Sequence, residues 1–106
     1  TKIIEVNNLV DLYMLICGNS LIKNVDNLVN LTHLDCKSTQ INNVDTLSKL
    51  EYINCTYTSI SSLINNNKLL KVYSSYNDII LPILTDIDRK WKNLQFGYNY
   101  VYISKN

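Results

Sequence analysis

Apolar and small polar residues recur along this chain at every nineteenth position. The interval is clearest over residues 28–63, where one pattern occurs twice in succession. A constant period of about 20 residues is typical of proteins built from stacked repeats, in which each copy buries its apolar side chains against the next. The matching residues of the two copies are Leu28, Leu31, Leu34, Cys36, Thr39, Ile41 and Val44, then Leu47, Leu50, Ile53, Cys55, Thr58, Ile60 and Leu63.

The same interval extends in both directions from this central pair of copies. The step from Asn77 to Asn99 is longer than the others by three positions, so the last copy follows an insertion. The complete pattern predicts five strand segments, preceded by half a copy. The additional matching residues are Ile3, Val6, Leu9, Leu12, Leu15, Cys17, Ser20, Ile22, Val25, Leu69, Val72, Ser74, Ile79, Trp91, Leu94, Phe96 and Val101.

Each copy contains a short alternation of apolar and polar residues, as in Leu34-Asp35-Cys36. This alternation predicts a strand that is buried on one face. Successive copies then form a parallel sheet, and apolar residues at every third position of the connections favour extended or 3₁₀ return segments. The stretch 83–91 is different, because its apolar residues have helical spacing and predict a short helix.

The consensus of the copies, L-x-x-L-x-C-x-x-T/N-x-I, resembles the leucine-rich repeat, whose general form is L-x-x-L-x-L-x-x-N/C-x-L. The resemblance implies a leucine-rich-repeat solenoid over residues 1–106, with a parallel β-sheet of about five strands. It also implies that the Ser, Thr or Asn after each strand bonds the backbone of the turn. The expected units are a partial repeat at 1–8 and repeats at about 9–27, 28–46, 47–65, 66–87 and 88–106.

The charge balance narrows the range of partners. Ten basic and nine acidic residues give this chain of 106 residues a net charge of +1 at pH 7. Such a balance argues against strong electrostatic binding of nucleic acid or of an anionic membrane. The chain has no apolar run that could span a bilayer, and its first residues lack the pattern of a signal peptide. We therefore expect no nucleic-acid partner and no membrane partner.

The three cysteines, Cys17, Cys36 and Cys55, occupy one inward column of the repeat. We expect free thiols stacked in the core, because a free Cys packs like a small apolar residue. Disulfides are disfavoured because in-register parallel neighbours do not aim their Cβ atoms at one another. A zinc site would need closer ligand spacing and a fourth ligand. Reduced thiols indicate the cytoplasm, or the cytosol of a host cell.

The sequence carries no motif of a known catalytic site. Its two glycines cannot form a phosphate-binding loop, and the signatures of metalloproteases and serine hydrolases are missing. His33, the only histidine, could act as a general base oriented by Asp35, which would share its face of the strand. Such chemistry needs a cleft that excludes water, which an open sheet does not offer. We therefore expect a solvated polar face here, and neither an enzyme nor a cofactor or metal site.

The resemblance implies a protein-protein recognition module that binds another protein through the concave face of its strands. Tyrosines favour binding surfaces, although stacked tyrosines can also simply cover a sheet. The alternative is a structural segment or spacer of a longer repeat protein, with no partner of its own. Unpaired edges of the terminal strands predict self-association. The candidate partner-binding residues are His33, Asp35, Lys37, Tyr52, Asn54, Lys71, Tyr73, Gln95, Tyr57, Tyr76 and Tyr98.

Overall fold

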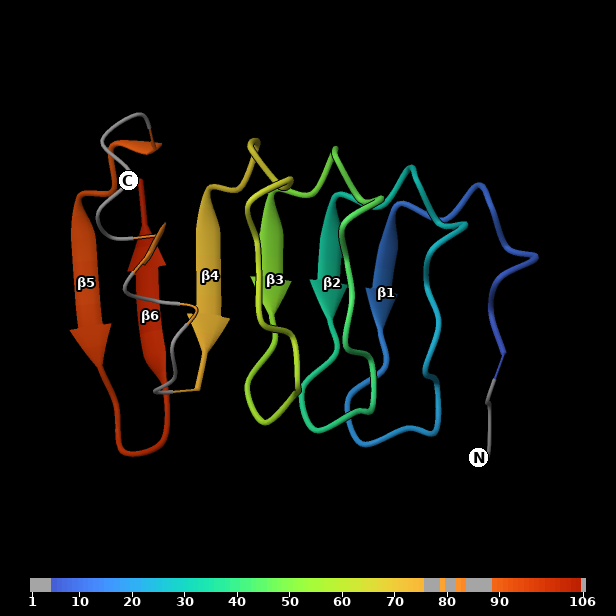
Figure 1. Ribbon diagram of the computed structural model, residues 1–106, viewed down its shortest axis with the longest axis horizontal. Helices are drawn as coiled ribbons and strands as arrows, with labels where there is room; N and C mark the ends of the chain where they lie inside the picture. Colours follow the sequence, from blue (N-terminus) through green and yellow to red (C-terminus); the bar gives the residue numbers. More distant parts are fainter. Residues whose placement is uncertain (1–4, 76–78, 80–81, 84–88, 106) are drawn as a thin grey trace.

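The computed structural model describes residues 5–75, 79, 82–83 and 89–105. Its strands form a single six-stranded sheet in the order β1-β2-β3-β4-β6-β5 (Figure 1). Apart from helical backbone at residues 82–83, the regular elements of the described residues are strands, and among these residues no helix is long and apolar enough to cross a membrane. The strands are β1 (Met14–Ile16), β2 (His33–Asp35), β3 (Tyr52–Asn54), β4 (Lys71–Ser74), β5 (Asn93–Phe96) and β6 (Val101–Ser104).

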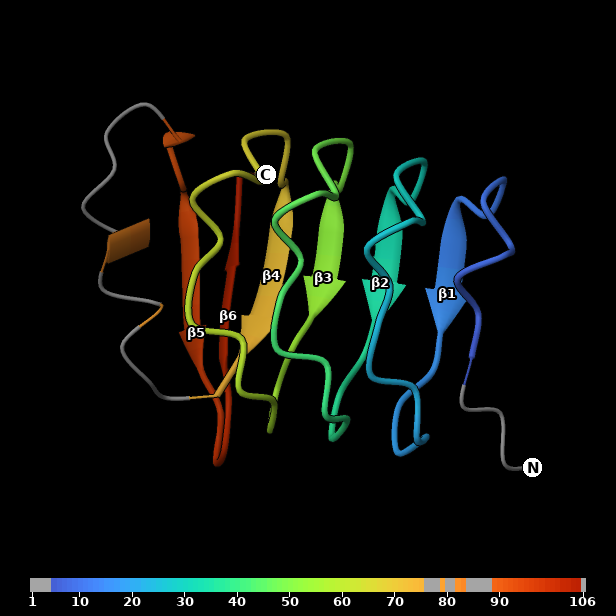
Figure 2. The same ribbon diagram turned by 45° about the vertical axis from the view of Figure 1, so that its right-hand side comes forward.

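The first four strands repeat one geometry. They pair in parallel, and their register places Met14, His33, Tyr52 and Lys71 side by side, each one repeat period after the last. The connections are extended segments that run over one face of this sheet (Figures 1 and 2). Strands and return segments therefore make two layers, as expected for the short connections of this repeat.

The apolar core lies between these two layers. The inward positions predicted from the repeat are buried over residues 22–72, and the free thiols of the three cysteines belong to the same cluster. The Thr39 hydroxyl donates to the Cys36 carbonyl oxygen at 2.6 Å. The Thr58 hydroxyl donates to the Cys55 carbonyl oxygen at 2.7 Å. The threonine after each of these strands thus bonds the backbone of the turn, as the sequence predicted.

The expectation of a leucine-rich-repeat solenoid with a purely parallel sheet of about five strands is wrong. The sheet is mixed, because β6 pairs antiparallel with both β4 and β5. Consequently β5, the expected fifth parallel strand, lies at the edge and is separated from β4 by one strand. Gln95 lies beside Tyr102 and not beside Tyr73, which the repeat had placed next to it.

The hairpin formed by β5 and β6 accounts for this departure. The Gly97 N–H donates to the Tyr100 carbonyl oxygen at 2.8 Å and closes a tight turn between the strands. Such a short loop loses little chain entropy when it closes. Antiparallel pairing is also slightly more stable per residue than parallel pairing.

The side chains of β6 fill the core next to β4. Val101 and Ile103 are buried, and Ile103 pairs with Val72 of β4. The corresponding residues of β5, Leu94 and Phe96, are 43% and 60% exposed. The two apolar residues of β6 therefore replace a further parallel copy against the last regular strand.

The predicted short helix near 83–91 falls mostly on residues 84–88, which lie outside the described part of the chain.

Asn66 occupies a column that holds leucine in the preceding copies and is fully buried. Its Nδ2 donates to the carbonyl oxygens of Val44 and Leu47, each at 2.9 Å. A polar side chain therefore joins two successive return segments.

Candidate functional site

A row of aromatic rings crosses the face of the sheet that points away from the core. The His33 and Tyr52 ring centroids are 6.0 Å apart, and those of Tyr52 and Tyr73 are 6.2 Å apart. The Tyr73 ring centroid also lies 4.4 Å from that of Tyr102 and 5.8 Å from that of Tyr100. These separations are typical of interacting aromatic pairs. The five residues therefore form one continuous surface, which we call the aromatic row.

The register of the sheet places these rings together. Alternation along each strand turns His33, Tyr52 and Tyr73 outward, since the residue that follows or precedes each one is buried. Antiparallel pairing then brings Tyr102 of β6 directly beside Tyr73. The rings are partly buried by their neighbours but still accessible, and Tyr100 is 40% exposed.

Tyr100 reaches the row by lying over Gly97. A Cβ atom on residue 97 would be 2.1 Å from Tyr100 Cε1 and 2.2 Å from Tyr100 Cζ. The ring therefore occupies the space that a side chain would need. The described chain has no glycine with positive φ, so close approach, and not backbone conformation, is what residue 97 requires. The absence of a side chain at residue 97 therefore leaves room for the Tyr100 ring beside Tyr73.

Polar groups flank the row where it crosses β2 and β3. Asp35 Oδ1 accepts a hydrogen bond from the Lys37 N–H at 3.2 Å. Asn54 Oδ1 accepts bonds from the N–H and the hydroxyl of Thr56, at 3.2 and 2.8 Å. Burial raises the pKa of Tyr52, and the charge of Asp35 raises it further. The Tyr52 phenol therefore keeps its proton and can donate a hydrogen bond to a ligand.

His33 and Asp35 share this face, but each has another partner. His33 Nδ1 lies 2.9 Å from the Thr32 hydroxyl oxygen, whereas Asp35 bonds the backbone of Lys37. A shallow hollow of about 140 Å³ adjoins them at the β1 end of the row. Among the described residues, no group of three or more His, Cys, Asp or Glu side chains could hold a metal ion. The arrangement offers a contact surface rather than an oriented catalytic pair.

Three other predicted residues surround the aromatic row. Lys71 is exposed at the start of β4, beside Tyr52 in the register. Lys37 is exposed just after β2. Gln95 is exposed on β5, and Tyr102 separates it from the rest of the predicted column. Of the three, Lys71 and Gln95 lie on strands of the sheet, and Lys37 lies in the turn after β2.

The expected column of Tyr57, Tyr76 and Tyr98 does not join the aromatic row. Tyr57 adopts a φ of 57° in the turn after β3, in the same turn position as Ser38 after β2. Tyr98 is 96% exposed in the turn of the hairpin. Tyr76 lies outside the described residues. The two described tyrosines therefore belong to strand-exit turns.

Sequence reasoning missed Tyr100 and Tyr102, which supply two of the five rings. A signal was present, because tyrosines alternate with other residues over 98–103, directly after Gly97. Such alternation after a glycine is typical of the second strand of a hairpin. The repeat pattern placed this segment after the last expected strand, within the repeat at 88–106, and not in a strand of its own.

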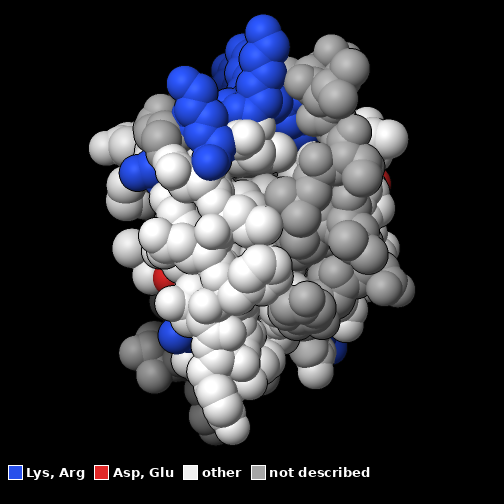
Figure 3. Space-filling model, turned by 90° about the vertical axis from the view of Figure 1, so that its left-hand side faces the viewer, with Lys and Arg blue, Asp and Glu red and all other residues white. Residues whose placement is uncertain are grey.

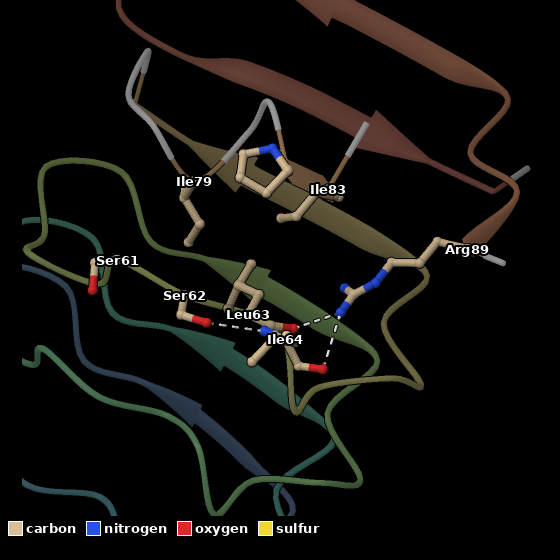
Figure 4. A pocket seen from close by; sticks show the side chains of 8 residues that line it. Ser61, Ser62, Leu63, Ile64, Ile79, Ile83 and Arg89 are labelled. Carbon is tan, nitrogen blue, oxygen red and sulfur yellow. Dashed lines mark hydrogen bonds between the residues drawn. The ribbon is translucent and has the colours of Figure 1, made fainter. Parts of the chain in front are cut away.

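A separate cavity of about 210 Å³ lies beside the last regular return segment (Figure 4). Arg89 points across it toward the backbone of residues 63–64 (Figure 4). Its Nη2 donates to the Leu63 carbonyl oxygen at 2.6 Å, and the Ile64 carbonyl oxygen is 3.4 Å away. The buried guanidinium therefore holds a return segment in place, in the way that Asn66 does one coil earlier.

The outward face thus combines a continuous aromatic surface with polar groups on β2 and β3. Aromatic side chains give a large contact area with few rotatable bonds, which suits binding. No known protein family, curated protein or solved structure matches this chain.

Proposed function

We propose that this chain is a protein-recognition module and that its partner binds across the aromatic row. The observation that carries the proposal is the run of ring contacts from His33 through Tyr52 and Tyr73 to Tyr102. Such a run is a preformed surface, because each ring is positioned by its neighbours before a partner arrives. Preorganised side chains lose less conformational entropy on binding.

The surroundings of the row favour a protein partner. Exposed apolar side chains, Met14 and Ile16, extend it on β1 at 47% and 74% exposure. Polar groups of Asp35 and Asn54 lie alongside on the same face. An apolar and aromatic centre beside polar groups is the usual composition of a protein interface.

Recognition also agrees better with the geometry than catalysis does. The hollow beside His33 is small and open, and His33 and Asp35 have other partners. We propose a reducing compartment such as the cytosol, because Cys17, Cys36 and Cys55 are all buried as free thiols.

The test compares two tyrosine variants of the chain. Tyr73→Ala removes the ring at the centre of the row, whereas Tyr98→Ala removes a tyrosine that is 96% exposed in a turn. Proteins retained from a lysate by the wild-type chain are identified, and the purified partner is titrated against each variant by calorimetry. Urea unfolding of both variants checks that they are folded.

We expect Tyr73→Ala to weaken binding by about thirtyfold, equivalent to about 2 kcal/mol for a central aromatic contact. Tyr98→Ala should bind as the wild type does. Equal affinities for a folded Tyr73→Ala chain and the wild type would contradict the proposal. That result would favour a structural segment or spacer, in which the rings only cover the sheet.

A further inference from the structure

Lysines gather at the end of the sheet where β4 and β5 begin and β6 ends. β6 lies between β4 and β5 and runs antiparallel to both, so its end lies beside the starts of its two neighbours (Figure 1). Lysines precede or begin β4, precede β5 and follow β6. The five residues, which we call the lysine cluster, are Lys68, Lys71, Lys90, Lys92 and Lys105.

Backbone hydrogen bonds bring members of the cluster on all three strands together. The Lys92 N–H donates to the carbonyl oxygen of Ser104, the residue before Lys105, at 2.9 Å. The Lys105 N–H donates to the carbonyl oxygen of Leu70, the residue before Lys71, at 3.0 Å. Two strand spacings therefore separate Lys71 from Lys92, a backbone distance of about 10 Å.

The charges of the cluster lack neighbouring carboxylates in the part of the chain that the structure describes. Figure 3 shows lysine and arginine side chains gathered at its upper end, with no acidic side chain visible among them. Within the described residues, no ion pair joins a lysine of the cluster to a carboxylate. The acidic residue nearest in the register is Glu51, which precedes β3 and therefore lies on the other side of β4 from β6.

This concentration of like charge works against folding. Like charges on adjacent strands repel one another, so the fold would be more stable if one of these positions were neutral or acidic. Departures of this kind from the rules of stability occur mainly at functional sites. The lysine cluster is therefore a candidate site for a negatively charged ligand.

The surroundings of the cluster favour a protein segment over a nucleic acid. Arginine suits phosphate best, but Arg89, the only arginine of the chain, is buried and donates to the Leu63 carbonyl oxygen. Apolar surface adjoins the lysines, since Leu70 is 39% exposed. The Lys105 Nζ also lies 5.6 Å from the centroid of the half-buried Trp91 ring. Apolar groups beside charges suit a protein surface.

We infer that the lysine cluster binds a short acidic segment of another protein. Carboxylates of that segment pair with the exposed ammonium groups, and its apolar side chains contact the surface around Leu70 and Trp91. The inference goes beyond the proposed function, because it uses side chains outside the aromatic row. Its failure would leave the proposal for Tyr73 and its neighbours unchanged.

The experiment measures binding of a labelled oligoglutamate peptide to the full chain by fluorescence anisotropy at low ionic strength. Lys92→Glu changes the cluster, whereas Lys23→Glu makes the same change of net charge at an exposed position after β1, at the other end of the strand order. Lys92→Glu should weaken binding more than about tenfold and Lys23→Glu less than about twofold. The fluorescence of Trp91 should change when the peptide binds the wild type.

Urea unfolding checks that the variants are folded. Lys92→Glu should be at least as stable as the wild type, because it removes repulsion within the cluster. Lys71→Glu, on the neighbouring strand, is a second variant that should also lose binding. A wild type that does not bind the peptide, or equal losses in Lys92→Glu and Lys23→Glu, overturns the inference. Tighter binding of a single-stranded oligothymidylate of the same length, or of phosphatidylserine vesicles, also overturns it, since the ligand would then be a phosphate.

Discussion

Gly97→Ala tests whether the Tyr100 ring is held in the aromatic row by the absence of a side chain. The added Cβ would lie 2.1 Å from the nearest ring carbon, whereas ordinary contact begins at 3.4 Å. The ring must therefore move away from residue 97 by the difference between these two distances. Because Tyr100 is 40% exposed, it can swing toward solvent, so the backbone need not change.

The change in the free energy of unfolding has two parts, one from the lost ring contact and one from the unfolded chain. Loss of the contact between Tyr73 and Tyr100 is expected to destabilise the fold by about 0.5–1.5 kcal/mol. Alanine at a position without positive φ stabilises by about 0.4–1 kcal/mol, because the unfolded chain has less freedom. Gly97→Ala should therefore reduce the free energy of unfolding by no more than about 1 kcal/mol.

A double-mutant cycle separates the two contributions. In the Tyr100→Ala background there is no ring to displace, so Gly97→Ala should stabilise the protein by about 0.4–1 kcal/mol. Urea unfolding of the four chains measures the difference, and the chemical shifts of the Tyr73 ring protons report loss of the Tyr100 ring. A Gly97→Ala effect that is the same in both backgrounds would refute the assigned packing.

Three further predictions concern the core. Thr39→Ala removes a buried hydrogen bond and should lower the free energy of unfolding, measured in urea, by about 1–2 kcal/mol. Thr46→Ala removes an exposed hydrogen bond and should lower it by less than about 0.5 kcal/mol. Equal changes in the two variants would contradict the burial of Thr39. Asn66→Ala leaves two carbonyl oxygens without its amide and should cost about 2–3 kcal/mol, so a neutral result would contradict the bonding described. Burial raises the pKa of Cys17 and of Cys55 from 9.0 to about 11. The unfolded chain therefore loses these protons first, and the free energy of unfolding should fall as pH rises from 9.0 to about 11. Native thiols should also react slowly with a thiol reagent at about pH 8, and fast labelling or stability that rises over this pH range would contradict the burial.

The regular part of the fold could be predicted from sequence because one physical constraint is repeated there. Leu34, Ile53 and Val72 occupy equivalent inward positions, and each copy is held by the same contacts to its neighbours. The hydroxyl bonds of Thr39 and Thr58 follow from the same repetition. Equivalent contacts recur in every copy of a periodic sequence, so the period is enough to predict them.

The C-terminal part could not be predicted in this way because its pairing is decided by competition. Both β5 and β6 have apolar residues at alternate positions, and the repeat favoured β5 as the neighbour of β4. The tight turn at Gly97 and the burial of Val101 and Ile103 favour β6 instead. The relative free energies of these two pairings depend on tertiary contacts that a sequence period does not contain.

The predicted binding surface was incomplete because the strand pairing next to β4 was predicted wrongly. His33, Tyr52 and Tyr73 were found from the column geometry of the parallel strands. Tyr102 enters the row only through antiparallel pairing, and Tyr100 only through its approach to Gly97. Tyr73 therefore gained two ring neighbours that the repeat assigned elsewhere.

Nuclear Overhauser contacts across β4 test the central claim most directly, because they report which strand lies beside it. The structure predicts a close Hα–Hα contact between β4 and β6 at the antiparallel pair Tyr73–Tyr102, whose backbone groups do not bond each other, together with ring contacts between these two tyrosines. Contacts that instead join Tyr73 directly to Gln95 would place β5 beside β4. That result would contradict both the mixed sheet and the aromatic row.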